Sequence, residues 1–307
     1  MSKRRNRPKA IWAVGGGKGG TGKTFLTSNM GIYLAKLGQS VLLVDADLGG
    51  ANLHTCLGLP SGHSGLADFF SGGQKDITDY VEETGVGNLY LLSGALDSPG
   101  FCPTVKDLER LRFALRRANA DYVILDVGSG TSREVMALFL TGELGIYVTI
   151  PEPTSIENTY RFLKEALYWI LTRANTRRSV REAIRNAFRS ESFVPIPQLM
   201  QQLVQQEPLA TENLENRMQD FRVSLVLNQV RGSEDIEIGF SIRSAIQKYF
   251  GVQVDFVGYV NSDDYVVQCL HMRKSLLQNY PESNAAKCIE NVTRKLLTSG
   301  ELGFGSH

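Results

Sequence analysis

The sequence lacks a surplus of charge of either sign: its 307 residues include 33 lysines and arginines against 32 aspartates and glutamates. A chain-wide nucleic-acid-binding signature is therefore excluded. It also lacks any run of about 18 apolar residues, so no transmembrane helix is predicted. The first ten residues, MSKRRNRPKA, hold five basic side chains. No apolar stretch follows them, which argues against a secretory signal.

Cysteine is scarce and scattered, with no C-x-x-C pair. This predicts reduced thiols in a cytoplasmic protein and argues against a disulfide framework or an iron–sulfur cluster. Histidine is equally sparse, and no second Cys/His pair stands at ligand spacing, so no zinc site is predicted. The residues concerned are Cys56, Cys102, Cys269, Cys288, His54, His63, His271 and His307.

Short apolar runs, by contrast, are abundant and alternate with amphipathic segments. Most of these runs are apolar on both faces, as parallel strands buried under helices are, which predicts an α/β fold with a mostly parallel sheet. The expected strands are 10–14, 41–44, 89–92, 122–125, 146–150, 223–227 and 254–260, and the expected helices lie near 23–37, 104–118, 132–141, 154–172 and 234–250.

One segment interrupts this rhythm. Residues 175–222 contain no strand candidate and are predicted to form a helical insertion. We expect a single domain over 1–307, with a basic arm at 1–9 and a glycine-rich, frayed tail at 299–307.

The stretch VGGGKGGTGKTF (residues 14–25) follows a predicted strand and opens a predicted helix. It contains the phosphate-loop pattern G-x-x-x-x-G-K-[ST], in which glycines let backbone N–H groups turn toward phosphate oxygens. Lys23 is expected to reach the β- and γ-phosphates, and the Thr24 hydroxyl to ligate Mg²⁺. The expected nucleotide-binding residues here are Gly17, Lys18, Gly19, Gly20, Thr21, Gly22, Lys23, Thr24 and Phe25.

The form GGKGGTGKT resembles the deviant Walker A motif of the MinD/ParA group of ATPases. VDADLGGANLHTCLGL (44–59) resembles the switch I segment of MinD and its flagellar relative FlhG, and YVILDVGSG (122–130) their switch II. VTIPEPTSIENTYRFLK (148–164) resembles the start of a helix in the same group. The resemblance implies a three-layer P-loop NTPase fold, with ATP and Mg²⁺ as cofactors.

Acidic residues stand at two predicted strand ends, where an open α/β sheet presents its ligands. Asp45 and Asp47 are two apart on an extended strand and so share a face. By resemblance, Asp47 positions the attacking water, Asp45 helps to organise the Mg²⁺ shell, and Asp126 holds Mg²⁺ through water. The alternative for Asp47 and Asp126 is a helix cap.

Two further residues are assigned by the same resemblance. Gly130 matches the glycine whose N–H meets the γ-phosphate. Asn228, at the end of VSLVLN, matches the asparagine whose amide reads the edge of adenine. The alternative for Asn228 is simply to end a strand.

Lys18 is a second lysine, which its own phosphate loop does not require. In the family this lysine reaches the nucleotide of a partner subunit, as a cationic finger supplied in trans. The resemblance therefore implies a homodimer in the ATP state and slow, dimerisation-dependent hydrolysis, with Lys18, Lys23, Asp47 and Asp126 as catalytic residues. The alternative is a solvated loop lysine.

Arginines recur every four residues from 173 to 189, which suggests a basic amphipathic helix for anionic lipid or DNA. Arg177, Arg181 and Arg185, with the N-terminal arm, are the candidates, and a peripheral position at the inner face of the membrane would follow. The alternative is a helix docked by an apolar face formed by Val180, Ile184, Ala187 and Phe188.

A C-terminal helix carries an apolar stripe of Ala285, Cys288, Ile289, Val292 and Leu296, which we expect to dock on the sheet rather than on a membrane. The N-terminal arm lacks the activator motif of FlhG-type proteins.

Three functions remain open. The first is a MinD/FlhG-type ATPase switch that controls placement or number of a cellular structure such as flagella or the division apparatus. The second is a non-catalytic ATP-binding regulator that antagonises a partner protein. The third is a metabolic enzyme on the same fold. The protein activator or cargo is not identified by the sequence.

Overall fold

The computed structural model describes residues 7–48, 50–60, 64–71, 76–94, 103–174, 177–190 and 194–301. Within these ranges an eight-stranded sheet runs in the order β3-β4-β2-β5-β1-β6-β7-β8. Its strands are parallel except for the β3–β4 pair. The strands are β1 (Ala10–Gly16), β2 (Val41–Ala46), β3 (Glu82–Glu83), β4 (Leu89–Leu92), β5 (Tyr122–Ser129), β6 (Leu144–Thr149), β7 (Val223–Val230) and β8 (Val254–Asn261).

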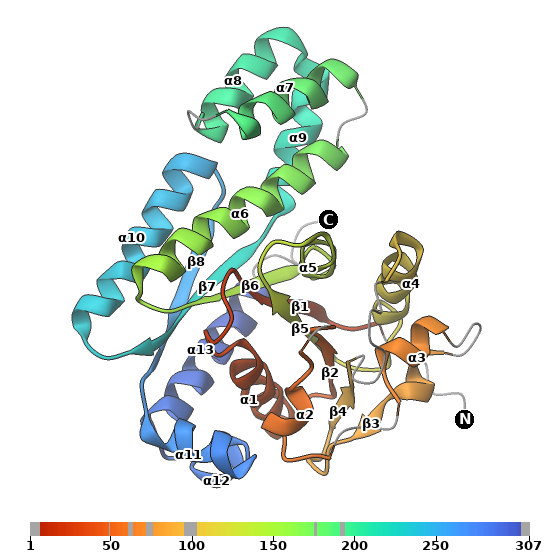
Figure 1. Cartoon of the computed structure of the whole chain (residues 1–307), viewed down its shortest axis with the longest axis vertical. Helices are drawn as coiled ribbons and strands as arrows, with labels where there is room; N and C mark the ends of the chain where they lie inside the picture. Colours follow the sequence, from red (N-terminus) through yellow and green to blue (C-terminus); the bar gives the residue numbers. More distant parts are fainter. Residues whose placement is uncertain are drawn as a thin grey trace.

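Helices cover both faces of the sheet, and alternate strand residues feed two separate cores (Figure 1). Trp12 and Val14 of β1 pack toward one face, and Ile11 and Ala13 toward the other. The first face carries α1 (Lys23–Lys36), α12 (Leu276–Asn279) and α13 (Asn284–Glu301), and the second α4 (Val105–Leu115), α5 (Arg133–Phe139), α6 (Pro153–Ala174) and α10 (Ser233–Phe250). The predicted three-layer α/β architecture is therefore confirmed.

Residues between α6 and β7 form three helices, α7 (Arg178–Arg189), α8 (Ile196–Gln206) and α9 (Pro208–Asp220). Figure 1 shows α7 and α8 beyond the sheet, past the far end of the long helix α6. Val180, Ile184, Leu199, Leu203 and Leu214 are buried among them and continue the second core. The assignment of 175–222 as an insertion into one domain stays a prediction.

The C-terminal helix α13 packs on β8 and α1. Ala285, Ile289, Val292 and Leu296 are buried there, which confirms the predicted docking of this apolar stripe, while Cys288 is only half-buried. None of the described helices is both long and apolar enough to span a bilayer.

Four short helices complete the described chain: α2 (Leu53–Cys56), α3 (Leu66–Ser71), η1 (Ile77–Tyr80) and α11 (Asp264–Met272). Several sequence expectations fall outside the described residues. These are the first six residues of the basic arm, the tail beyond residue 301, Cys102, His63 and His307.

Candidate nucleotide site

The phosphate loop lies at a topological switch point of the sheet. Strand β1 stands between β5 and β6. Helix α1 leads from β1 to β2 on one side, whereas α5 leads from β5 to β6 on the other. Connections that diverge in this way open a crevice at the carboxyl ends of the strands, where α/β sheets bind ligands.

Glycines shape the loop between β1 and α1. Gly20 (φ 79°) and Gly22 (φ 88°) have left-handed backbones, and a side chain on Gly22 would collide with the Asn228 amide. A Cβ on Gly17 would lie 2.5 Å from the Asn158 carbonyl oxygen, so this end of the loop is pressed against α6. No atom lies within 4 Å of the position that a Gly20 Cβ would take, which leaves that side of the loop open.

Lys23 is the first residue of α1, so its side chain starts where the helix presents unpaired N–H groups. The side chain is buried, and its ammonium donates to the Lys18 carbonyl oxygen at 3.4 Å, folding back over the loop. Burial lowers the pKa of Lys23, and the charges of Asp126 and Asp47 oppose that shift. A buried ammonium over an open loop is suited to binding an anion there.

Asp45 and Asp126 face each other on neighbouring strands, being paired in register across β2 and β5. Both are buried. Burial, followed by the charge of Asp126, raises the pKa of Asp45 to about 8, although the backbone N–H groups of Leu53 (2.9 Å) and Asp47 (3.3 Å) donate to its carboxylate. The raised pKa means that two buried carboxylates side by side are not fully compensated by positive charge in the nucleotide-free chain.

Asp126 interacts with two threonine hydroxyls and with Lys23. Burial raises its pKa to about 6, while the hydroxyls of Thr24 and Thr27 and the charge of Lys23 act in the opposite direction. The Thr27 hydroxyl donates to Asp126 at 3.3 Å. The structure thus brings Lys23, Thr24 and both buried aspartates together. It also places the Phe25 side chain in the core under α1, so only its backbone can face a ligand.

Asp47 follows β2 and is half-buried. Its carboxylate lies against Gly128, where an added Cβ would stand 3.0 Å from Asp47 Oδ1. Sequence reasoning did not assign Gly128, although its place two residues after Asp126 was the available signal.

Gly130 has a left-handed backbone (φ 92°) with open space beside it. Its N–H donates to the Gly16 carbonyl oxygen at 3.1 Å. In this conformation the N–H that was expected to meet a γ-phosphate is engaged by the end of β1, and the phosphate contact stays a prediction.

The side chains of Asn228 and Gln229, at the end of β7, hydrogen-bond to the phosphate loop. The Asn228 amide donates to the Thr21 carbonyl oxygen at 2.8 Å, and the Gln229 amide to that of Gly20 at 3.3 Å. The proposed adenine contact of Asn228 stays a prediction, because its amide nitrogen holds the loop here.

Lys18 points away from its own loop. Its ammonium lies 2.9 Å from Glu152 Oε2 and 3.3 Å from the Thr154 hydroxyl, and both ends of this ion pair are substantially exposed. Sequence reasoning missed Glu152, which immediately precedes α6. It also missed Tyr147, whose buried hydroxyl accepts the Gly17 N–H at 2.7 Å.

These residues fit a magnesium nucleotide. Gly19 and Gly20 form the exposed side of the loop, and Lys23 supplies a buried cation. A divalent ion would reduce the repulsion between Asp45 and Asp126. Among the described residues no group of three or more His, Cys, Asp or Glu side chains forms a metal site by itself. Mg²⁺ is usually bound through one or two carboxylates together with substrate phosphates and water, and Asp45 and Asp126 could supply the carboxylates.

Two arginines at the start of α7 are paired with glutamates, and the binding of this segment to anionic lipid or DNA stays a prediction. Arg177 pairs with Glu207, and Arg178 pairs with Glu182 at 2.8 Å. Val180 and Ile184 are buried beneath the helix, so α7 docks by its apolar face.

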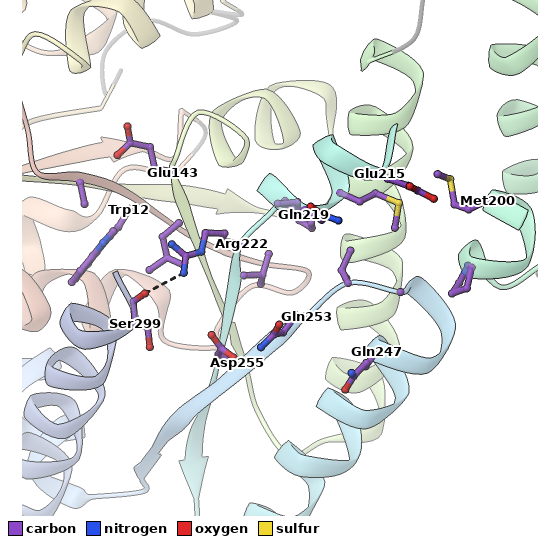
Figure 2. A pocket seen from close by; sticks show the side chains of 18 of the residues that line it. Trp12, Glu143, Met200, Glu215, Gln219, Arg222, Gln247, Gln253, Asp255 and Ser299 are labelled. Carbon is purple, nitrogen blue, oxygen red and sulfur yellow. Dashed lines mark hydrogen bonds between the residues drawn. The ribbon is translucent and has the colours of Figure 1, made fainter. Parts of the chain in front are cut away.

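A cavity of about 720 Å³ lies at the opposite, amino-terminal ends of the strands (Figure 2). Trp12, Arg222, Gln247 and Asp255 line it, and the Arg222 guanidinium donates to the Ser299 carbonyl oxygen at 3.2 Å. None of the phosphate-loop residues lines this cavity. It is therefore separate from the candidate nucleotide site.

Comparison with known proteins agrees with this site. Residues 12–267 match the family model of the CobQ/CobB/MinD/ParA nucleotide binding domain. The chain belongs to this family, and the resemblance drawn from the sequence motifs is confirmed.

Two curated relatives match about half of the chain. The antiactivator FleN of Pseudomonas aeruginosa is 33% identical over 160 residues, which cover 51% of this chain and 56% of FleN. A putative septum site-determining protein MinD of Oltmannsiellopsis viridis is 34% identical over 155 residues, covering 50% of this chain and 49% of that protein. The chain thus spans about half the length of these relatives.

Solved structures match over most of the chain. The cell division ATPase MinD of Pyrococcus furiosus superposes with a TM-score of 0.62 at 20% identity, covering 94% of this chain and 98% of that one. MinD of Pyrococcus horikoshii, complexed with Mg-ADP, gives 0.61 at 21% identity, with coverage of 96% and 98%. These likenesses show a shared fold.

Proposed function

We propose that this chain is an ATP-dependent dimerising switch that hydrolyses ATP slowly and thereby controls the placement or number of a cellular structure. The observation that carries the proposal is the convergence of Lys23, Thr24, Asp45, Asp47 and Asp126 beside an open glycine loop.

Each side chain has a distinct task in this proposal. Lys23 binds the β- and γ-phosphates, and Thr24, Asp45 and Asp126 hold Mg²⁺, partly through water. Bound there, Mg²⁺ neutralises charge on the triphosphate. Asp47 accepts a hydrogen bond from the attacking water and orients it. Gly128 keeps that carboxylate in place because no side chain competes for its position.

Lys18 completes the site from a second copy of the chain. Within its own subunit it is held by Glu152 at the surface, so its ammonium is accessible from outside. Delivered to the partner's phosphates, it would stabilise the charge that develops in the transition state; trans cationic fingers of this kind accelerate hydrolysis by about 10³–10⁵-fold.

The test is size-exclusion chromatography with light scattering, in ADP and in ATP. Asp47→Ala should accumulate as a dimer in ATP because hydrolysis is blocked, and Lys18→Ala should stay monomeric while keeping most of its nucleotide affinity. Lys295→Ala, an exposed lysine on α13, is the matched control and should behave as the unmodified chain. Normal turnover by monomeric Lys18→Ala would refute the switch.

The relative FleN favours a second candidate, a regulator that binds ATP and antagonises a partner protein, because it is named an antiactivator. The two candidates differ in turnover. Intact ATP binding with no phosphate release by the unmodified chain, under conditions in which it dimerises, would favour the regulator.

Attachment to an anionic membrane or to DNA through Arg177, Arg181, Arg185 and the N-terminal arm belongs to the same proposal. A cytoplasmic protein would then work at the inner face of the membrane or on DNA. Reversal of the three arginines to glutamate should weaken binding to anionic vesicles or to duplex DNA. Unchanged binding to both vesicles and DNA would refute attachment through these arginines.

A further inference from the structure

Six arginines, on four different helices or in the residues just after them, line a hollow to which the phosphate loop does not contribute. The hollow has a volume of about 780 Å³ and lies among α4, α5, the carboxyl end of α6 and the end of α9. Figure 1 shows α5 between α4 and α6. We call five of these arginines the cationic surface: Arg112, Arg116, Arg133, Arg173 and Arg217. The sixth, Arg222, donates to the Ser299 carbonyl oxygen.

The charges of the cationic surface are not neutralised within the described part of the chain. None of its five arginines forms an ion pair there, whereas Arg161, Arg177, Arg178 and Arg294 each pair with a glutamate. Glu109, Glu143 and Asp220 also line the hollow, but they are outnumbered.

The arginines also repel one another. The pKa of Arg112 is lowered by partial burial and then by the charges of Arg116, Arg217 and Arg173, with Glu109 acting in the opposite direction. The pKa of Arg173 is lowered in the same way, by partial burial and by Arg133. The repulsion between these arginines slightly destabilises the free protein. An anion bound among them would reduce the repulsion, so anion binding is favoured.

Apolar side chains accompany the charge. Leu140, Trp169 and Ile170 line the hollow and are half-buried, and the Arg173 guanidinium lies 4.2 Å from the centre of the Trp169 ring. Val105 at its edge is 43% exposed. A second hollow of about 660 Å³ shares Arg116 and Glu143 with the first and contains Phe113, which is 64% exposed.

We propose that the cationic surface binds an acidic segment of a partner protein, with glutamate or aspartate side chains on the arginines and an apolar side chain in the hollow. Arginine and exposed aromatic residues are the types enriched at the energetic centres of protein interfaces, and the guanidinium fork matches a carboxylate. A DNA duplex would meet Glu109, Glu143 and Asp220 with its phosphates and would leave the apolar side chains unused.

Binding is measured by fluorescence anisotropy on the full chain. The probes are a labelled glutamate-rich peptide with leucines between the glutamates, the same peptide with glutamine for glutamate, and a random-sequence DNA duplex. The acidic peptide should bind, the glutamine peptide should bind much more weakly, and the affinity should fall as salt is raised.

Arg112→Glu combined with Arg217→Glu should weaken acidic-peptide binding by about tenfold or more. Arg243→Glu with Lys248→Glu is the matched control, because both are exposed cations on α10 that do not line the hollow, and it should leave the affinity unchanged. The milder pair Arg112→Gln with Arg217→Gln should weaken binding to an intermediate degree, and thermal unfolding verifies that each variant is folded.

Absence of peptide binding, or equal losses in the test and control pairs, would overturn the proposal. Tighter binding of the duplex than of the peptide, lost in the Arg112/Arg217 variant alone, would overturn it in favour of nucleic acid.

Discussion

Asp47 owes its position to a missing side chain on the neighbouring strand. Gly128→Ala would put a Cβ 3.0 Å from Asp47 Oδ1 and force the carboxylate to shift. Because small misplacements of a reacting group are costly, we expect turnover to fall by about tenfold or more, with ATP affinity nearly unchanged. The measurement is steady-state phosphate release together with nucleotide titration.

Gly87→Ala is the matched control, since no atom lies within 4 Å of the Cβ position there. It should leave turnover and affinity unchanged. A Gly128→Ala protein with normal turnover would show that the working position of Asp47 does not depend on Gly128.

The buried carboxylates also predict how stability depends on pH. The pKa of Asp45 is raised from 3.8 to about 8, so the native state binds the proton that the unfolded state releases. Between about pH 6, where the raised pKa of Asp126 lies, and about pH 8, the stability of the nucleotide-free protein should fall as pH rises, by up to about 1.4 kcal/mol per pH unit. Urea unfolding in metal-free buffer between about pH 6 and about pH 8 checks this slope.

Asp45→Asn removes the titrating group and should flatten the slope over that range. Addition of Mg²⁺ with nucleotide should flatten it as well in the unmodified chain, because a bound cation favours the ionised carboxylates. A steep slope that persists in Asp45→Asn would assign it to another group.

At the scale of elements, α13 behaves as part of the core. Ile289 is fully buried in the cluster that joins α13 to α1 and β1. Ile289→Ala should therefore cost about 2–5 kcal/mol of unfolding free energy. Lys295→Ala, exposed on the same helix, should change it by less than about 0.5 kcal/mol. A small effect of Ile289→Ala would mean that the helix is only loosely docked.

The elements were largely predictable from the sequence, because each buried parallel strand is a short apolar run and each run is bounded by polar residues. The phosphate loop was predictable for a related reason: its residues are consecutive, so a local pattern describes the whole loop. Contacts between distant segments were not. Lys18 and Glu152 are 134 residues apart, and the bond from Gly130 to Gly16 depends on how β5 and β1 pair.

The arginines illustrate the same limit. The four-residue spacing of arginines predicted a basic helix in the region of α7, where Arg177 and Arg178 are paired with glutamates. The arginines of the cationic surface come from α4, α5, α6 and α9 or the residues just after them, and only the fold brings them together. A surface whose residues come from four helices cannot be predicted from a local sequence pattern.

At the scale of the whole molecule, Lys18 is held by Glu152 in the isolated chain. For Lys18 to serve a partner subunit this exposed ion pair must open, which costs at most about 1 kcal/mol. Glu152→Gln should therefore tighten ATP-dependent dimerisation by up to about fivefold. Sedimentation in a non-hydrolysable ATP analogue measures the dimer dissociation constant.

Glu157→Gln is the matched control, since it opens an exposed ion pair with Arg161 on the same helix. It should leave dimerisation unchanged. Weaker dimerisation in Glu152→Gln alone would mean that Glu152 itself contacts the partner subunit.

Helix α6 runs without interruption for 22 residues, a length of about 33 Å. It begins beside Glu152 and ends at Ala174, one residue after Arg173, so one stiff helix joins the neighbourhood of Lys18 to the cationic surface. Because the helix is about 33 Å long, a tilt of about 3° at its first residue would displace its last residue by about 1.7 Å. A displacement that small would be enough to change how closely Arg173 approaches Arg133 and Arg112.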